Sequence, residues 1–113
     1  AQSVFAACCE YTGMDEKTAL ALSAGFGGGA RSGELCGAVT GAIMAEGLVF
    51  PFNDGQDTEA KDKIASIAKQ CVNIAREKYG YVRCADLKGN IDCSEIIAFM
   101  AKTAEDIMKK EKN

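Results

Sequence analysis

Six cysteines are the residues of this 113-residue chain best suited to chemistry. Histidine is absent, which excludes Cys–His and Ser–His nucleophilic pairs and mixed cysteine–histidine zinc sites. The sequence contains no CxxC pair, so neither a thioredoxin-type motif nor a zinc ribbon is predicted. Sulfur therefore remains as the nucleophile, and sulfur and carboxylate oxygen remain as metal ligands.

Cys36 has the most suggestive position of the six. It follows a glycine-rich stretch, GFGGGARSGE at 25–34, and falls in the first turn of an expected helix, within CGAVTG at 36–41. Free amide groups and the positive end of the helix dipole favour a thiolate over a thiol at such a place. The alternative is that Cys36 is a small buried side chain beside a tight turn.

Cys84 and Cys93 flank the connector before the last helix. Cys84 is expected in a loop, and Cys93 at the start of the helix. A loop of this length can close a disulfide or supply two ligands to one metal ion. As structural residues the two would simply pack.

The other three cysteines are weaker candidates. Cys8 and Cys9 are adjacent on the first expected helix and diverge by about 100°, so at most one should face a given site. Cys71 lies on the apolar stripe of a long helix and is predicted to belong to the core.

Helical periodicity dominates the rest of the chain. Asp15, Ser32 and Thr58 are expected as helix caps, and most carboxylates are expected on exposed helix faces. Strand-type alternation is nowhere sustained. The prediction is an all-α, single-domain antiparallel bundle of about five helices. Its helices are expected at about 2–11, 18–26, 33–50, 58–79 and 93–110.

Small residues recur at helical spacing directly after Cys36. Gly37, Gly41 and Ala45 form one small-residue face, and Ala38 and Ala42 form another. Such faces let helices approach closely, which predicts tight packing within the domain and could also support a homodimer.

Charge and hydropathy exclude some partners. The net charge of −3 and the scattered basic residues argue against a nucleic-acid partner. No apolar run approaches the roughly eighteen residues of a bilayer span, so membrane insertion is not predicted. The absence of a secretory signal pattern favours a cytoplasmic over a secreted location. Because the chain starts at Ala1 rather than Met, a processed or truncated product is expected, and upstream residues could have carried a signal.

The segment GFGGGARSGELCGAVTGAIMAEGL at 25–48 resembles the signature of the redox-active proteins named for a CGAxxG motif, the C_GCAxxG_C_C family. The likeness continues through YGYVRCADL at 79–87 to Cys93 and covers nearly the whole chain. It implies one helical domain over residues 1–113 whose cysteines serve redox chemistry or metal binding. Cys36, Cys84 and Cys93 match three of the four family cysteines, and the fourth belongs immediately before Ala1.

Three functions from different classes follow. In thiol–disulfide redox with an unknown partner, Cys36 is the nucleophile and Cys84 or Cys93 resolves the mixed disulfide. In the second, the same three cysteines hold an iron–sulfur cluster or another thiolate-bound metal, completed by Cys8, Cys9, an external ligand or another chain. In the third, the cysteines only pack within a structural or interaction module. Nucleotide binding is not predicted, since GFGGGARSG lacks the GK[ST] ending of a phosphate loop.

Overall fold

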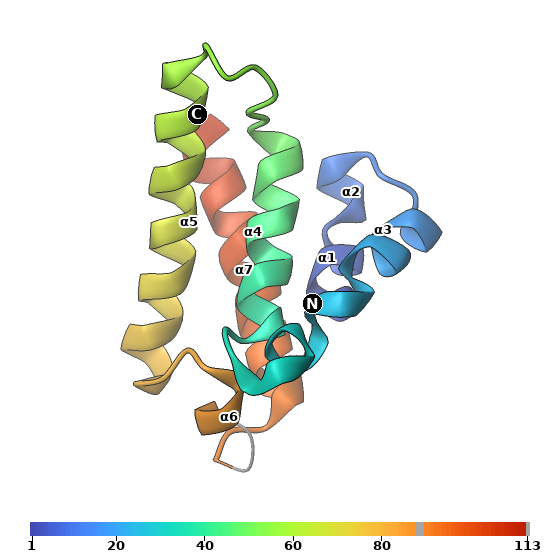
Figure 1. The fold of residues 1–113 in the computed structure, drawn as a ribbon, viewed down its shortest axis with the longest axis vertical. Helices are drawn as coiled ribbons and strands as arrows, with labels where there is room; N and C mark the ends of the chain where they lie inside the picture. Colours follow the sequence, from blue (N-terminus) through green and yellow to red (C-terminus); the bar gives the residue numbers. More distant parts are fainter. Residues whose placement is uncertain (88–89, 113) are drawn as a thin grey trace.

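Three long helices form the body of the computed structural model, which describes residues 1–87 and 90–112 (Figure 1). They are α4 (Gly37–Val49), α5 (Thr58–Tyr79) and α7 (Cys93–Lys112). α4 and α7 run in the same direction and pack side by side (Figure 1). α5 runs antiparallel to both and packs against them (Figure 1). Val39, Ile67 and Met100, one from each helix, are fully buried in the core between them.

α5 follows directly from its sequence. Ile67, Cys71 and Ala75 recur every fourth residue and are buried, as the apolar stripe predicts. The helix begins when the carboxylate of Asp57 accepts a hydrogen bond from the Ala60 amide (3.0 Å), so Asp57 rather than Thr58 is the cap. It ends at Gly80, whose φ of +80° suits glycine.

The N-terminal segment forms three shorter helices, of which the first two pack against α4 and the third packs against the first. α1 (Gln2–Ala7) and α2 (Cys9–Thr12) replace the single helix expected at 2–11, because the chain breaks at Cys8. α3 (Glu16–Ser23) is capped as predicted by Asp15, which accepts from the Thr18 amide at 3.0 Å. A short turn, η1 (Ala24–Phe26), ends this segment.

The glycine-rich stretch forms a left-handed turn and delays the start of α4. Four consecutive residues, 28–31, have positive φ, including Ala30 (+60°) and Arg31 (+58°). The following segment, η2 (Gly29–Gly33), therefore cannot join α4, and the helix expected from 33 begins at Gly37. Ser32 does not cap it; its hydroxyl donates to the Ala30 carbonyl at 3.1 Å.

A short backbone pairing joins the segment before α4 to the segment after α5. The Cys36 amide donates to the Val82 carbonyl (2.7 Å), and the Cys84 amide donates to the Glu34 carbonyl (2.6 Å). Leu35 and Arg83 thus face each other as an isolated antiparallel bridge. A helix that the sequence did not predict, α6 (Cys84–Leu87), follows at once.

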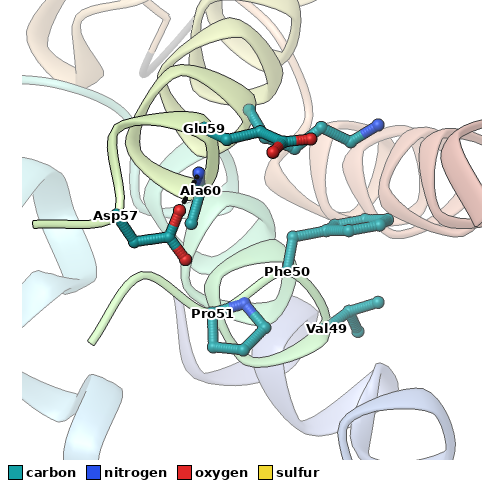
Figure 2. A pocket seen from close by; sticks show the side chains of 7 residues that line it. Val49, Phe50, Pro51, Asp57, Glu59 and Ala60 are labelled. Carbon is teal, nitrogen blue, oxygen red and sulfur yellow. Dashed lines mark hydrogen bonds between the residues drawn. The ribbon is translucent and has the colours of Figure 1, made fainter. Parts of the chain in front are cut away.

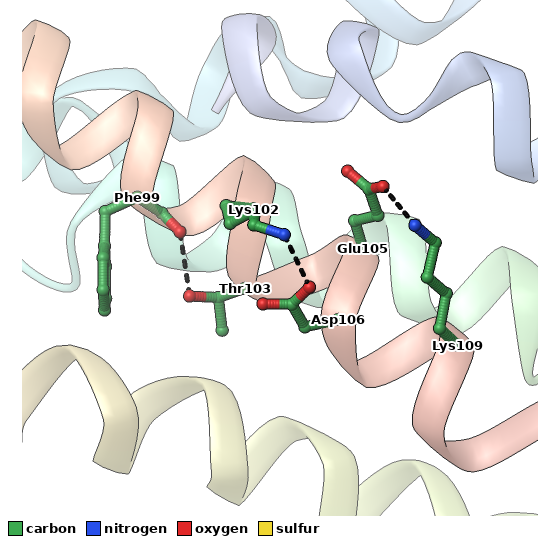
Figure 3. A network of polar contacts seen from close by, with 6 residues as sticks. All are labelled: Phe99, Lys102, Thr103, Glu105, Asp106 and Lys109. Atoms are coloured by element: carbon green, nitrogen blue, oxygen red, sulfur yellow. Dashed lines mark hydrogen bonds and ion pairs between the residues drawn. The ribbon is translucent and has the colours of Figure 1, made fainter.

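The all-α prediction is confirmed, whereas the antiparallel bundle of about five helices is not. Seven α-helices occur in the described ranges, since the first expected helix is split and α6 was missed. On α7, ion pairs Lys102–Asp106 (3.0 Å) and Lys109–Glu105 (2.7 Å) follow the i, i+4 spacing (Figure 3). None of the described helices is long and apolar enough to cross a bilayer.

Candidate functional site

All three predicted cysteines line one cavity, although they are far apart in the sequence. Cys36, Cys84 and Cys93 border a space of about 280 Å³ at the end of the molecule where α4 and α7 begin. The rest of its wall is small or apolar and consists of Ala1, Gly28, Gly37, Ala38, Ile96 and Ile97. Sequence analysis predicted the cysteines but none of this wall as site residues.

Each of these cysteines stands at the start of a helix. Cys36 is the N-cap of α4, and its carbonyl accepts from the amides of Val39 (3.0 Å) and Thr40 (3.1 Å). Cys84 is the first residue of α6, and Cys93 is the first residue of α7. The positive ends of the two long helices, α4 and α7, therefore point toward the cavity that holds the sulfurs.

The pairing of residues 34–36 with 82–84 fixes the spacing of two of the cysteines. In an antiparallel pairing with these two hydrogen bonds, Cys36 and Cys84 are diagonal neighbours on one face. Diagonal neighbours lie about 7–8 Å apart. A disulfide needs Cβ atoms about 4 Å apart, so one between them requires movement. All six cysteines are free in the structure.

The three cavity cysteines differ in access to solvent. Cys36 is buried with 9% of its surface exposed, Cys84 is half-buried and Cys93 is exposed. The three sulfurs that line this cavity therefore differ in how easily a molecule in solvent can reach them.

The glycines after Cys36 bring the start of the chain to the cavity. A Cβ on Gly37 would lie 2.8 Å from the Ala1 nitrogen, and one on Gly41 would lie 2.6 Å from the Ala1 oxygen. Ala1 thus packs against the small-residue face predicted for α4, and this packing places Ala1 beside Cys36 in the cavity wall.

The family model for "Putative redox-active protein (C_GCAxxG_C_C)" matches residues 1–107. The chain belongs to the C_GCAxxG_C_C family. Comparison with curated proteins and with solved structures finds no match. Membership confirms the resemblance seen in the motifs and supports a redox-active protein, without saying which groups react.

The cysteines of this C_GCAxxG_C_C protein converge without forming a metal centre in the present arrangement. No group of three His, Cys, Asp or Glu side chains within residues 1–87 and 90–112 is placed so that it could hold a metal ion. The donor set suits a soft metal chemically. The geometry of the described residues does not bring three such donors together as ligands of one ion.

Two further cysteines of the family member lie in its core, beside a carboxyl group that sequence analysis missed. Cys8 (2% exposed) and Cys71 (0%) are both near Glu46, which is itself fully buried. Among the described residues neither Glu46 oxygen has a hydrogen-bond partner. Burial, followed by the charge of Glu111, raises the pKa of Glu46 to about 7. Its position in the otherwise apolar run GAIMAEGLVF at 41–50 could have revealed it.

A second hollow, of about 400 Å³, lies at the opposite end of the body, where α4 ends and α5 begins (Figures 1 and 2). Two of its polar side chains have partners: Asp57 caps α5, and the Lys63 ammonium pairs with Glu111 at 2.7 Å. Phe50 and Pro51 complete its wall (Figure 2). It holds no cysteine, so it is a weaker candidate than the cysteine cavity.

Proposed function

We propose that this protein carries out thiol–disulfide redox chemistry with the cysteines of the cavity. The observation that supports this best is the meeting of Cys36, Cys84 and Cys93 in one cavity from three separate segments of the chain. Membership of a family described as redox-active agrees with it. Cysteines that only fill space in the core would not need to meet in one cavity, nor to belong to a family described as redox-active.

The reaction is a two-electron exchange. Two cavity thiols and one external disulfide, RSSR′, give an intramolecular disulfide and the two thiols RSH and R′SH. The protein is oxidised, the external disulfide is reduced, and the two protons of the cavity thiols pass to the leaving thiolates.

Disulfide mapping tests the proposal. The reduced protein is incubated with oxidised glutathione, quenched with acid, alkylated and mapped by peptide mass spectrometry. We expect one disulfide per chain, joining two of the three cavity cysteines. Cys9→Ser is the matched control, because Cys9 is half-buried outside the cavity and its loss should leave that disulfide unchanged.

Two outcomes would contradict the proposal. One is a protein that stays fully reduced under conditions that oxidise a free dithiol, and the other is a disulfide that involves Cys8, Cys9 or Cys71 instead. The metal-binding alternative is decided in parallel by measuring iron, zinc and acid-labile sulfide on protein purified without oxygen. Metal near one equivalent per chain, lost together with cavity cysteines, would favour that alternative.

A further inference from the structure

We propose that Cys93 is the sulfur that attacks the external disulfide and that Cys36 is the internal sulfur that resolves the mixed disulfide. This inference rests on the proposed function and assigns an order to its two steps. It reverses the order expected from the sequence, in which Cys36 attacks first.

Access to solvent separates the two roles. A thiolate must approach a disulfide along the S–S axis, so the attacking sulfur has to be reachable by the whole external molecule. Cys93 is exposed, whereas Cys36 is buried with 9% of its surface accessible. A disulfide that arrives from solvent therefore meets Cys93 first.

The backbone holds Cys36 in the interior. Its amide donates to the Val82 carbonyl at 2.7 Å, and its carbonyl accepts from the amides of Val39 and Thr40. Bringing Cys36 to the surface would break these bonds and open the packing of Ala1 on Gly37. Cys93 has no such tie to another segment within the described residues. Its helix start is held by its neighbour Asp92, whose carboxylate accepts from the Ser94 amide at 2.9 Å.

The packing of α4 on α7 pairs these two cysteines. The helices lie side by side and run in the same direction, so their first residues stand at the same end of the body (Figure 1). Cys36 caps one, Cys93 opens the other, and both line the cavity. Cys84 is instead held by the pairing with residues 34–36 and begins a helix of four residues.

The two steps balance without another reactant. In the first, the Cys93 thiolate attacks RSSR′, a Cys93–SR bond forms, and R′S⁻ leaves with the electron pair of the broken bond. In the second, the Cys36 thiolate attacks the Cys93 sulfur, the Cys36–Cys93 bond forms and RS⁻ leaves into solvent. Each thiolate has first given up its proton, and the two leaving thiolates take up two protons.

Trapping the mixed disulfide tests the order. Reduced wild type, Cys36→Ser, Cys93→Ser and the control Cys9→Ser are mixed with oxidised glutathione and quenched with acid at successive times. The site of glutathione attachment is then mapped. We expect Cys36→Ser to accumulate glutathione on Cys93, and Cys93→Ser to react at least about tenfold more slowly than wild type. Early quenching of wild type should show the adduct on Cys93 as well, and this readout does not depend on a variant that folds.

The outcomes separate this inference from the proposed function. Rapid glutathione attachment to Cys36 in Cys93→Ser, or an early wild-type adduct on Cys36, would overturn Cys93 as the attacking sulfur while leaving the redox function intact. A Cys84–Cys93 disulfide in Cys36→Ser would overturn Cys36 as the resolving sulfur. If wild type forms no intramolecular disulfide, the order and the proposed function both fail.

Discussion

The cavity and the core place the same side chain in opposite chemical settings. In the cavity, Cys36, Cys84 and Cys93 occupy helix starts, and Cys84 and Cys93 are accessible to solvent. In the core, burial raises the pKa of Cys8 to about 11 and that of Cys71 to about 12, and Glu46 contributes to both shifts. Burial therefore distinguishes the two core cysteines from Cys84 and Cys93, which solvent can reach.

The largest expected contrast is in alkylation. Iodoacetamide should label Cys93 in the native protein at least about 1,000-fold faster than Cys71, because Cys71 reacts only from the small unfolded fraction. Peptide mass spectrometry of a labelling time course at neutral pH measures both rates. Denatured protein, in which both should react at similar rates, is the control. Similar native rates would abolish the contrast between the two regions.

The buried carboxyl of Glu46 should make the core side of the comparison pH-dependent. Its pKa is raised from 4.5 to about 7 in the folded protein, so folding favours the protonated form. The associated stability is present below pH 4.5 and is lost as the pH rises through 7, a loss of about 3 kcal/mol. Urea unfolding at pH 5 and pH 8 should show this loss in wild type and little of it in Glu46→Gln.

Glu77→Gln is the matched control for that experiment, because Glu77 is exposed on α5. It should keep the wild-type pH dependence. If Glu46→Gln loses as much stability between the two pH values as wild type, another group causes the pH dependence. The pH dependence is then not a property of the core around Glu46.

Truncation should separate the core cysteines from the cavity cysteines. Cys71→Ala leaves a void in the core and should lower the free energy of unfolding by about 1–2 kcal/mol. Cys93→Ala, at an exposed position, should change it by no more than about 0.5 kcal/mol. Denaturant unfolding of the reduced proteins provides both values. A larger loss for Cys93→Ala would mean that the cavity cysteine is needed for folding.

The smallest expected effect concerns the left-handed turn at the cavity. Ala30 has a φ of +60°, a conformation that costs an L-residue about 1 kcal/mol, so Ala30→Gly should be neutral or stabilising by up to that amount. Ala65→Gly, at an exposed site in α5, should instead destabilise by about 1 kcal/mol. Thermal unfolding compares the two. The same sign for both would show that the turn stores no strain.

The helices could be predicted where local chemistry decides them. α5 has the predicted bounds because its apolar stripe and Gly80 agree, although its cap is Asp57 and not the expected Thr58. The start of α4 was predicted four residues early because Ser32 looks like a helix cap. Residue propensities also do not predict the left-handed conformation of Ala30 and Arg31. The break at Cys8 has no sequence marker at all.

The three cysteines of the candidate site could be named from the sequence, but the shape of the cavity that they line could not. The motif indicated Cys36, Cys84 and Cys93, and the structure places them around one cavity. The solvent exposure of each cysteine depends on where the first residues of α4, α6 and α7 lie relative to one another, and tertiary packing alone decides this. For the same reason Glu46 looked like a surface carboxylate.

The bridge between Leu35 and Arg83 also bears on how the protein folds. It joins segments separated by the whole of α4 and α5, and contacts so distant in sequence form late compared with local helical turns. Until the chain closes this loop, Cys36 and Cys84 are on independent segments, and neither has the neighbours it has in the cavity. A newly made chain thus presents its cysteines to its surroundings as unrelated thiols, and it acquires a defined sulfur site only at the end of folding.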